Sequence, residues 1–238
     1  MADYQKIATE TRLKVLELIY KGQTSHIGSN FSVIDMAVVL YQNLKPEDEV
    51  IWSKGWASAT KYILEDYDTT NFPEDPPSLL LTGSAGHGLP IGVGLALSKK
   101  RTKKSGTVYV IMSDGEMNCG TTWESALLAS HHKLDNLVVL VDRNGLQAMG
   151  KTEDIVKLEP LESKWDSFGW DKSVMDGHRY RGIDLAIDMT NGVLGRPSVV
   201  IFNTIKGKGV NFMENDNNYH YLQLTKEDYE AAVHQLSN

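Results

Sequence analysis

Two short runs of apolar residues, separated by a stretch with helical spacing, constrain the fold of this chain more than any other feature. The first run covers residues 108–112 and the second covers residues 137–141. Uninterrupted apolar runs of this length are typical of strands that are buried on both faces of a parallel sheet. Between them, Trp123, Leu127 and Leu128 recur at helical spacing. The sequence therefore predicts a strand–helix–strand unit, whose right-handed crossover sets the two strands parallel.

Polar residues follow both predicted strands. Asp114 ends the first and Asn144 ends the second. Since the carboxyl ends of parallel strands meet at one edge of a sheet, where open α/β folds bind ligands, we expect these two side chains to lie close together. Their oxygens suit Mg²⁺ or Ca²⁺, and the Gly115 N–H at the start of the next helix can receive a phosphate. The residues favour a metal-bridged diphosphate, although Asp-Gly and Asn-Gly are also ordinary turn signals.

The longer pattern resembles the thiamine diphosphate motif of thiamine enzymes. It consists of Ser-Asp-Gly-Glu at residues 113–116 and an asparagine thirty positions after the aspartate, each behind an apolar run. The sequence that continues to Asn144 resembles the N-terminal half of a transketolase. This resemblance implies that Asp114, Asn144 and the main-chain carbonyl of Leu146 hold the metal, and that Gly115 contacts the diphosphate.

Two other stretches resemble the same family. Residues 25–41 look like the transketolase segment that presents a histidine to the sugar, which implies a catalytic role for His26. The glycine-dense residues 82–96 look like the segment beneath the rings of the cofactor. Three of its residues are thereby placed with the cofactor: Gly83, Ser84 and Ala85.

Four further residues match functional positions of transketolases. His220 lies where the family carries a histidine near the diphosphate and the substrate. His87 lies where separate N-terminal subunits often have a histidine in the active site, and a structural role at a helix start is the alternative. Glu124 resembles a catalytic-site glutamate of a carboxylate network between subunits. Glu116 resembles the acidic, cofactor-side residue of a D-G-E variant of the metal motif.

The chain departs from the family pattern at three places. Trp56 replaces a histidine that is expected over the cofactor, and an indole has one N–H donor and does not titrate. It either packs in the core or at a subunit interface, or forms a flat apolar wall beside the cofactor for a larger or less phosphorylated substrate. Cys119 replaces a network glutamate, and we expect it simply to pack. The segment of residues 55–83 is shorter than the segment that we expect in ordinary transketolases, and this difference argues against a pentose phosphate substrate.

The bulk properties agree with one soluble, cytoplasmic domain. The resemblance covers essentially all 238 residues, so we expect one diphosphate-binding domain over 1–238. Its predicted fold is α/β, a doubly wound and mostly parallel sheet with helices on both faces. The net charge of −7 gives no support for nucleic-acid binding, and no apolar run approaches the roughly 18 residues of a membrane span. The single cysteine fits a reducing compartment.

The resemblance also implies a partner chain. In transketolases the pyrimidine-binding domain carries the glutamate that activates the cofactor, and no residue here resembles it. We therefore expect a second subunit with the pyrimidine-binding and C-terminal domains, in a heterotetramer. The predicted reaction moves a two-carbon ketol unit from a ketose to an aldehyde with thiamine diphosphate and Mg²⁺ or Ca²⁺. Modified or nucleotide-linked sugars are the expected substrates.

Two alternative functions remain open from the sequence. A different thiamine diphosphate decarboxylase or carboligase would keep the metal motif but would not need His26 and His220. A non-catalytic subunit that only binds a partner would tolerate Trp56, but would not be expected to retain Asp114 and Asn144 together with Gly83.

Overall fold

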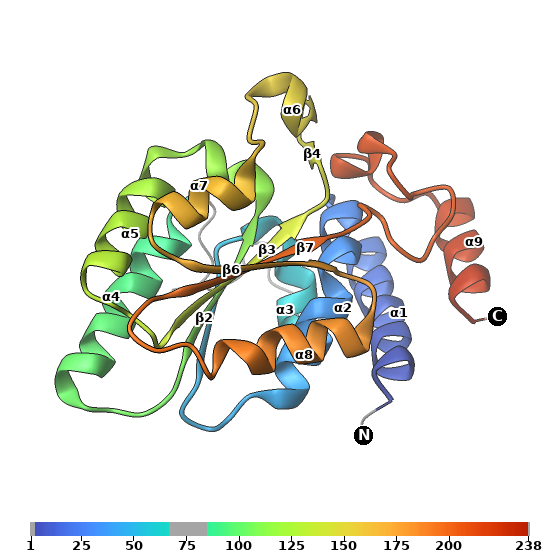
Figure 1. Ribbon diagram of the computed structural model, residues 1–238. Helices are drawn as coiled ribbons and strands as arrows, with labels where there is room; N and C mark the ends of the chain where they lie inside the picture. The colour runs from blue at the N-terminus through green and yellow to red at the C-terminus, as the bar shows by residue number, and fades with distance from the viewer. Residues whose placement is uncertain (1–2, 67–84, 238) are drawn as a thin grey trace.

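A five-stranded parallel sheet forms the centre of the computed structural model, which describes residues 3–66 and 85–237 (Figure 1). The strands are β1 (Glu49–Trp52), β2 (Val108–Ser113), β3 (Leu137–Arg143), β6 (Asp171–Asp176) and β7 (Ser198–Asn203). They lie in the order β1-β2-β3-β7-β6, and every neighbouring pair is parallel. The strands predicted from the two apolar runs, β2 and β3, are adjacent, so the predicted parallel sheet is confirmed.

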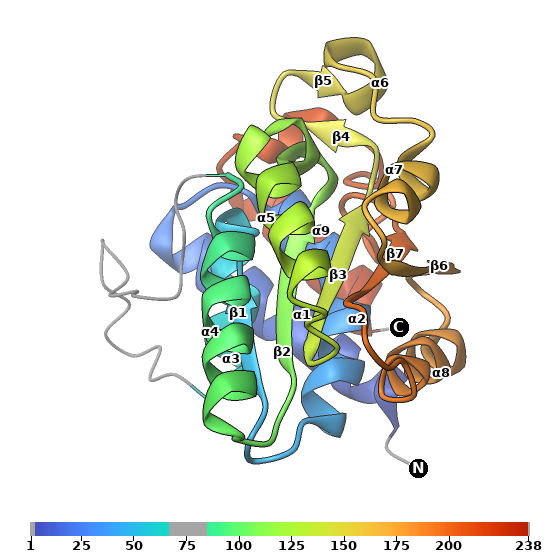
Figure 2. The ribbon, with the colours of Figure 1, turned by 60° about the vertical axis from the view of Figure 1, so that its left-hand side comes forward.

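Helices cover both faces of this sheet (Figures 1 and 2). The α-helices are α1 (Tyr4–Gly22), α2 (Ile27–Asn43), α3 (Ser58–Leu64), α4 (Gly88–Thr102), α5 (Gly120–His131), α6 (Thr152–Ile155), α7 (Leu161–Ser167), α8 (Tyr180–Thr190) and α9 (Lys226–Ser237). Short 3₁₀ helices are η1 (Gly55–Ala57), η3 (Asp114–Asn118) and η4 (Asn217–His220), and β4 (Leu146–Gln147) pairs with β5 (Gly150–Lys151) in a small hairpin.

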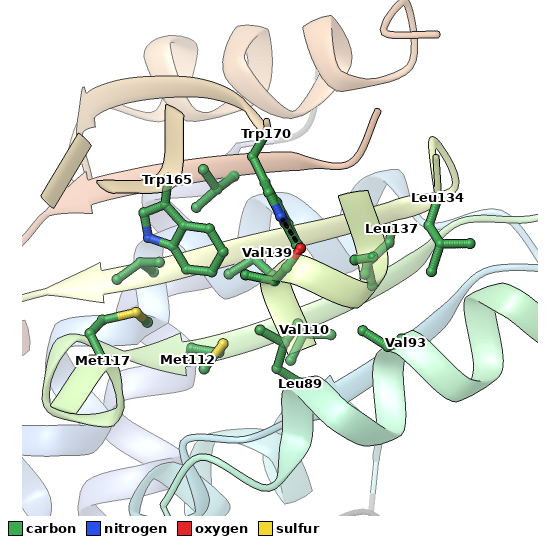
Figure 3. Close-up of a cluster of buried hydrophobic side chains, with 14 of the residues drawn as sticks. Leu89, Val93, Val110, Met112, Met117, Leu134, Leu137, Val139, Trp165 and Trp170 are labelled. Atoms are coloured by element: carbon green, nitrogen blue, oxygen red, sulfur yellow. Dashed lines mark hydrogen bonds between the residues drawn. The ribbon is translucent and has the colours of Figure 1, made fainter. Parts of the chain in front are cut away.

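Alternate residues of the central strands face opposite layers, as the pleat of a strand requires. Val110 and Val139 belong to the core under α4, α5 and α7, where the Trp170 indole N–H donates to the Ala126 carbonyl at 2.9 Å (Figure 3). Ile111 and Leu140 belong to the core under α2 and α8. The central strands are therefore buried on both faces, and the doubly wound α/β prediction is confirmed.

Two helix starts next to the sheet edge have unusual caps. Helix α2 begins at Ile27, because His26 adopts a left-handed backbone (φ 74°) and its carbonyl accepts the Asn30 side-chain amide at 3.0 Å. The N-cap of α5 is Cys119, although two threonines follow it at positions 121 and 122. The Thr122 hydroxyl donates instead to the Glu116 carbonyl at 2.7 Å.

The carboxyl ends of β1, β2 and β3 meet at one edge of the sheet. The chain leaves β3 into the β4–β5 hairpin and α6, which extend beyond the end of the sheet (Figure 2).

In the part of the chain that the structure describes, no helix combines the length and the apolar character that crossing a membrane needs.

Candidate active site

A cavity of about 210 Å³ lies at the carboxyl ends of β1, β2 and β3. The segments that follow these strands form its walls together with residues from the start of α2 and from η4. The sequence-predicted site residues that line it are Trp56, Ala85, Asp114, Gly115, Glu116, Asn144, Leu146 and His220. The parallel register thus brings Asp114 and Asn144 to one cavity, which is the placement that the β-α-β pattern predicts.

Asp114 is buried in the lining of this cavity, and its carboxylate accepts hydrogen bonds from donors of the same chain. Its Oδ2 accepts from the Arg143 guanidinium at 2.9 Å and from the Gly145 N–H at 2.8 Å. Within the described residues, its Oδ1 accepts only from the Gly115 N–H, at 2.8 Å. Burial raises the pKa of the Asp114 carboxyl, against the hydrogen bond from Arg143. The N–H expected to receive a phosphate is therefore engaged with the carboxylate, and Oδ1 keeps room for one further partner.

A fully buried ion pair lies behind Asn144. The Asp142 carboxylate bonds to the Lys54 ammonium, and it accepts the Ser32 hydroxyl at 2.6 Å and the Asn144 side-chain amide at 3.1 Å. The Asn144 Oδ1 in turn accepts the Leu146 N–H at 3.0 Å. This network fixes which side-chain atom of Asn144 bonds to Asp142 and which bonds to Leu146. Sequence reasoning missed Lys54 and Asp142, although a lysine two positions after the strand β1 was a usable signal for Lys54 itself.

Glu116 ties three segments together beneath the cavity. Its carboxylate accepts from the Ser53 hydroxyl, from the Gly86 N–H at 3.1 Å and from the Ser113 N–H at 2.9 Å. The close approach continues at Gly88, where a Cβ would lie 2.2 Å from the Cβ of Ser53, so only glycine fits. Both oxygens of Glu116 are thus occupied within the chain, which gives this residue a structural role in addition to its place on the cavity wall.

Aromatic rings gather at the mouth of the cavity. The His26 ring stacks on the Trp56 indole, with centroids 4.4 Å apart and an interplanar angle of 11°, and it meets His220 edge-on at 4.9 Å. Trp56 is 53% exposed, so the alternative that it packs in the core is wrong. Burial, with Lys206 nearby, lowers the pKa of His26 to about 4 and that of His220 to about 3. Both imidazoles are therefore neutral at pH 7.

Lys206 is a buried cation next to this cluster, and its sequence context predicts only a positional lysine near the cofactor or facing the partner chain. Its ammonium lies 2.8 Å from the Asn217 Oδ1 and 2.9 Å from the His220 Nδ1. Burial, followed by the charge of Lys54, lowers the pKa of Lys206 to about 8. The Lys-Gly-Lys-Gly string at residues 206–209 was a signal for this residue, but the string alone does not tell a buried lysine from an exposed one.

Other predicted residues lie away from the cavity lining. His87 is exposed at the N-cap of α4, where its side chain makes no capping hydrogen bond and its Nδ1 lies 3.2 Å from the Ala85 carbonyl. Glu124 is exposed on α5. Cys119 is half-buried, with its thiol donating to the Ala85 carbonyl at 3.6 Å. Gly83, Ser84 and most of the shortened segment lie outside the described residues, so their predicted roles stay predictions.

Most of this chain matches one known protein family. Residues 68–237 match one family, described as transketolase, thiamine diphosphate binding domain. The chain belongs to the transketolase family. Its match to that domain also supports thiamine diphosphate as the cofactor, and the sequence prediction of a transketolase-like N-terminal subunit is confirmed.

Two relatives match almost end to end. The relative from Phocaeicola vulgatus, named as a subunit of an apulose-4-phosphate transketolase, is 35% identical over 96% of this chain and 92% of its own length. The 6-deoxy-6-sulfo-D-fructose transketolase subunit SqwG of Clostridium sp. is 35% identical over 98% of this chain and 96% of its own length. Short relatives named as subunits therefore share the extent of this chain.

Solved transketolases share the fold. The transketolase from Leishmania mexicana superposes with a TM-score of 0.92 at 22% identity, over 100% of this chain and 42% of that chain. The transketolase from Campylobacter jejuni gives a TM-score of 0.89 at 23% identity, over 100% of this chain and 43% of that chain. The parallel sheet with its two helical layers thus corresponds to one part of a longer transketolase chain.

Proposed function

We propose that this chain is the metal- and diphosphate-binding subunit of a two-subunit enzyme that transfers a two-carbon ketol unit from a ketose to an aldehyde. One observation carries the proposal: in a chain of this family, Asp114, Asn144 and Gly115 line the same cavity as His220, and the His26 ring meets the His220 ring edge-on. A decarboxylase or carboligase would not need this pair of histidines, so their presence argues against that alternative.

The oxygen atoms on one wall of the cavity fit Mg²⁺ or Ca²⁺. Asp114, Asn144 and Leu146 would hold the ion through a carboxylate, an amide oxygen and a main-chain carbonyl, which are the hard ligands that these cations prefer. Asp114 Oδ1 and Asn144 Oδ1 each accept one hydrogen bond within the described chain, so each keeps a lone pair. When bound, thiamine diphosphate supplies the electron sink for breaking the bond next to the ketose carbonyl.

The chain's own residues would orient the sugar. His26 and His220 are neutral at pH 7, so they would bind hydroxyl or carbonyl oxygens by hydrogen bonds rather than by charge. Trp56 brings a flat apolar face and no titratable group, which suits a sugar with less charge at this end. Ala85 and Glu116 complete the cofactor side of the cavity. Gly83, Ser84 and His87 keep the roles that the family resemblance implies for them.

The names of the relatives favour a modified sugar as the substrate class. One is named for apulose 4-phosphate and the other for 6-deoxy-6-sulfo-D-fructose, and this chain shares their extent. Their designation as subunits supports a partner that carries the pyrimidine-binding and C-terminal domains, while residues 1–238 form the single diphosphate-binding domain. We infer a heterotetramer of two such pairs, with Glu124 at a contact between subunits.

The proposal is tested by reconstitution. This chain is combined with a separately encoded C-terminal transketolase-like subunit, thiamine diphosphate and Mg²⁺, and ketol transfer from a panel of modified and ordinary ketoses is measured by product mass. Transfer that requires both chains, the cofactor and the metal is the expected result. A cofactor-loaded complex that only decarboxylates 2-keto acids, or that turns over neither class, would contradict it.

A further inference from the structure

Lys206 is one of the largest fully buried side chains of the molecule, with 1% of its surface exposed. Among the described residues, no carboxylate lies within ion-pair distance of its ammonium, whereas the other buried lysine at this edge, Lys54, pairs with Asp142. Burying an unpaired charge is costly, so its hydrogen-bond partners must matter. These are Asn217 at 2.8 Å and His220 at 2.9 Å.

The direction of the bond to His220 follows from the chemistry of the two groups. An ammonium carries three donors and no acceptor, so the His220 Nδ1 must be the acceptor. A neutral imidazole with an unprotonated Nδ1 carries its proton on Nε2. Within the described chain, Asn217 fixes the lysine from the other side, because its Oδ1 accepts from the ammonium while its Nδ2 donates to the Ala148 carbonyl at 3.1 Å.

The other ring nitrogen of His220 is available for a ligand. His220 lines the cavity that also contains Asp114 and Asn144. Within residues 3–66 and 85–237, no residue makes a hydrogen bond to the His220 Nε2. The neighbouring His26 and Tyr221 contact the His220 ring edge-on, with ring centroids 4.9 and 4.7 Å away. A histidine whose Nδ1 is occupied by a buried cation can meet an incoming oxygen only through Nε2.

We propose that Lys206 is a positioning residue that keeps His220 neutral, with its proton on Nε2, so that this histidine donates a hydrogen bond to an oxygen of the substrate or of the diphosphate. The identity of that oxygen rests on the proposed function, whereas the tautomer and the neutral state do not. The charged and titratable groups that act on His220 are Lys206, His26 and Lys54. Each of the two lysines disfavours an imidazolium, and Lys206 is the one in direct contact.

Nitrogen NMR of the ¹⁵N-histidine-labelled chain tests this proposal without cofactor, partner or turnover. The His220 signals are identified by their loss in a His220→Gln variant. In the wild type we expect a protonated Nε2 and an acceptor Nδ1, unchanged between pH 7 and pH 5. In Lys206→Met we expect His220 to titrate nearer the ordinary value of about 6.5, because the neighbouring positive charge is gone. Lys206→Arg, which keeps a donor, should restore the wild-type pattern.

Lys208→Met is the matched control, since it removes a lysine two positions away that pairs with Glu214 at 3.1 Å. It should leave the His220 signals unchanged. A wild-type His220 with its proton on Nδ1, an imidazolium at pH 6, or a Lys206→Met variant with an unchanged His220 would each overturn the proposal. If Lys206→Met does not fold, the wild-type and Lys206→Arg spectra still decide.

Kinetics of the reconstituted enzyme form the second arm. Lys206→Met should lower kcat/KM about tenfold, the scale seen when the outer partner of a functional histidine is removed. Lys206→Arg should recover most of the loss and Lys208→Met should show none. An enzyme without any ketol transfer would overturn the proposed function alone, because the spectra report on Lys206 and His220 independently.

Discussion

Asp114 illustrates how much of the site is preorganised by single residues. Its Oδ2 receives Arg143 and Gly145, whereas its Oδ1 receives only the neighbouring Gly115 among the described donors. Burial raises the pKa of this carboxyl, and the hydrogen bond from Arg143 opposes that shift. These donors fix the orientation of the side chain, and its less occupied oxygen is the one that suits a cation.

Asp114→Ala should abolish the metal-dependent retention of thiamine diphosphate by the reconstituted complex, because it removes the carboxylate ligand. Bound cofactor is measured after desalting, with Mg²⁺ and with a chelator. Asp154→Ala is the control, since Asp154 is exposed on α6 and close in sequence to the same hairpin. Retention that stays equal to the wild type in the presence of Mg²⁺ would refute the metal assignment.

Trp56→His should shift the enzyme towards small sugar phosphates. The indole stacks on His26 and offers an apolar face, whereas an imidazole offers hydrogen bonds to sugar or phosphate oxygens. One such bond corresponds to about 1.4 kcal/mol, so kcat/KM for a ketopentose phosphate should rise about tenfold. Leu194→His, at an 85% exposed position, is the control. An improvement no larger than in that control would sink the interpretation of Trp56 as a specificity wall.

At the scale of elements, local patterns predict what is regular. The strands at residues 108–112 and 137–141 follow from short apolar runs, and their parallel pairing follows from crossover handedness. Contacts between distant segments do not follow in this way. Lys54 and Asp142 are 88 residues apart, and nothing near either residue signals the pairing. The stack of His26 on Trp56 also depends on a left-handed backbone at a histidine, which ordinary propensities disfavour.

Asp35 of α2 links α1, α8 and the segment after β6. It accepts from Arg12 of α1 at 2.8 and 2.9 Å, from His178 after β6 at 2.7 Å, and from Tyr180 of α8 at 2.8 Å. Burial alone would raise the pKa of Asp35. The hydrogen bonds from His178 and Arg12 nevertheless hold this pKa well below its usual range. Its contribution to stability is therefore present above the unfolded pKa of about 3.9 and is lost as the pH falls through lower values.

Asp35→Ala should lower the free energy of unfolding by about 3–5 kcal/mol at pH 7, because Arg12 then remains buried without its partner. Urea unfolding at pH 7 and at about pH 3, below the unfolded pKa, is the measurement, and the variant should lose less additional stability on acidification than the wild type. Asp166→Ala removes an exposed ion pair with Lys172 at 3.1 Å and should cost less than about 1 kcal/mol. Equal losses in both variants would show that Asp35 does not link these elements.

On the scale of the whole molecule, α5 carries the surface that the family resemblance assigns to a contact between subunits. Its inner side packs in the core with Ala126 and Ala129. Its outer side presents Glu124 together with Leu127 and Leu128, three residues that share one helix face because they are three and four positions apart. Leu127 is 62% exposed and Leu128 is 46% exposed. An apolar helix face beside a predicted network glutamate is what a buried contact between subunits would require.

Leu127→Glu should therefore weaken assembly with the C-terminal transketolase-like subunit, because a carboxylate would have to be desolvated in the contact. Native mass spectrometry of the mixture with thiamine diphosphate and Mg²⁺, titrated over subunit concentration, gives the dissociation constant of the hetero-oligomer, which should rise at least about tenfold, equivalent to about 1.4 kcal/mol. Leu185→Glu is the matched control, since Leu185 is 56% exposed on α8, against the opposite face of the sheet. Equal assembly of both variants would remove α5 from the interface and leave Glu124 as an ordinary surface residue, whereas selective loss in Leu127→Glu would place the partner against the helix that follows the metal-motif strand.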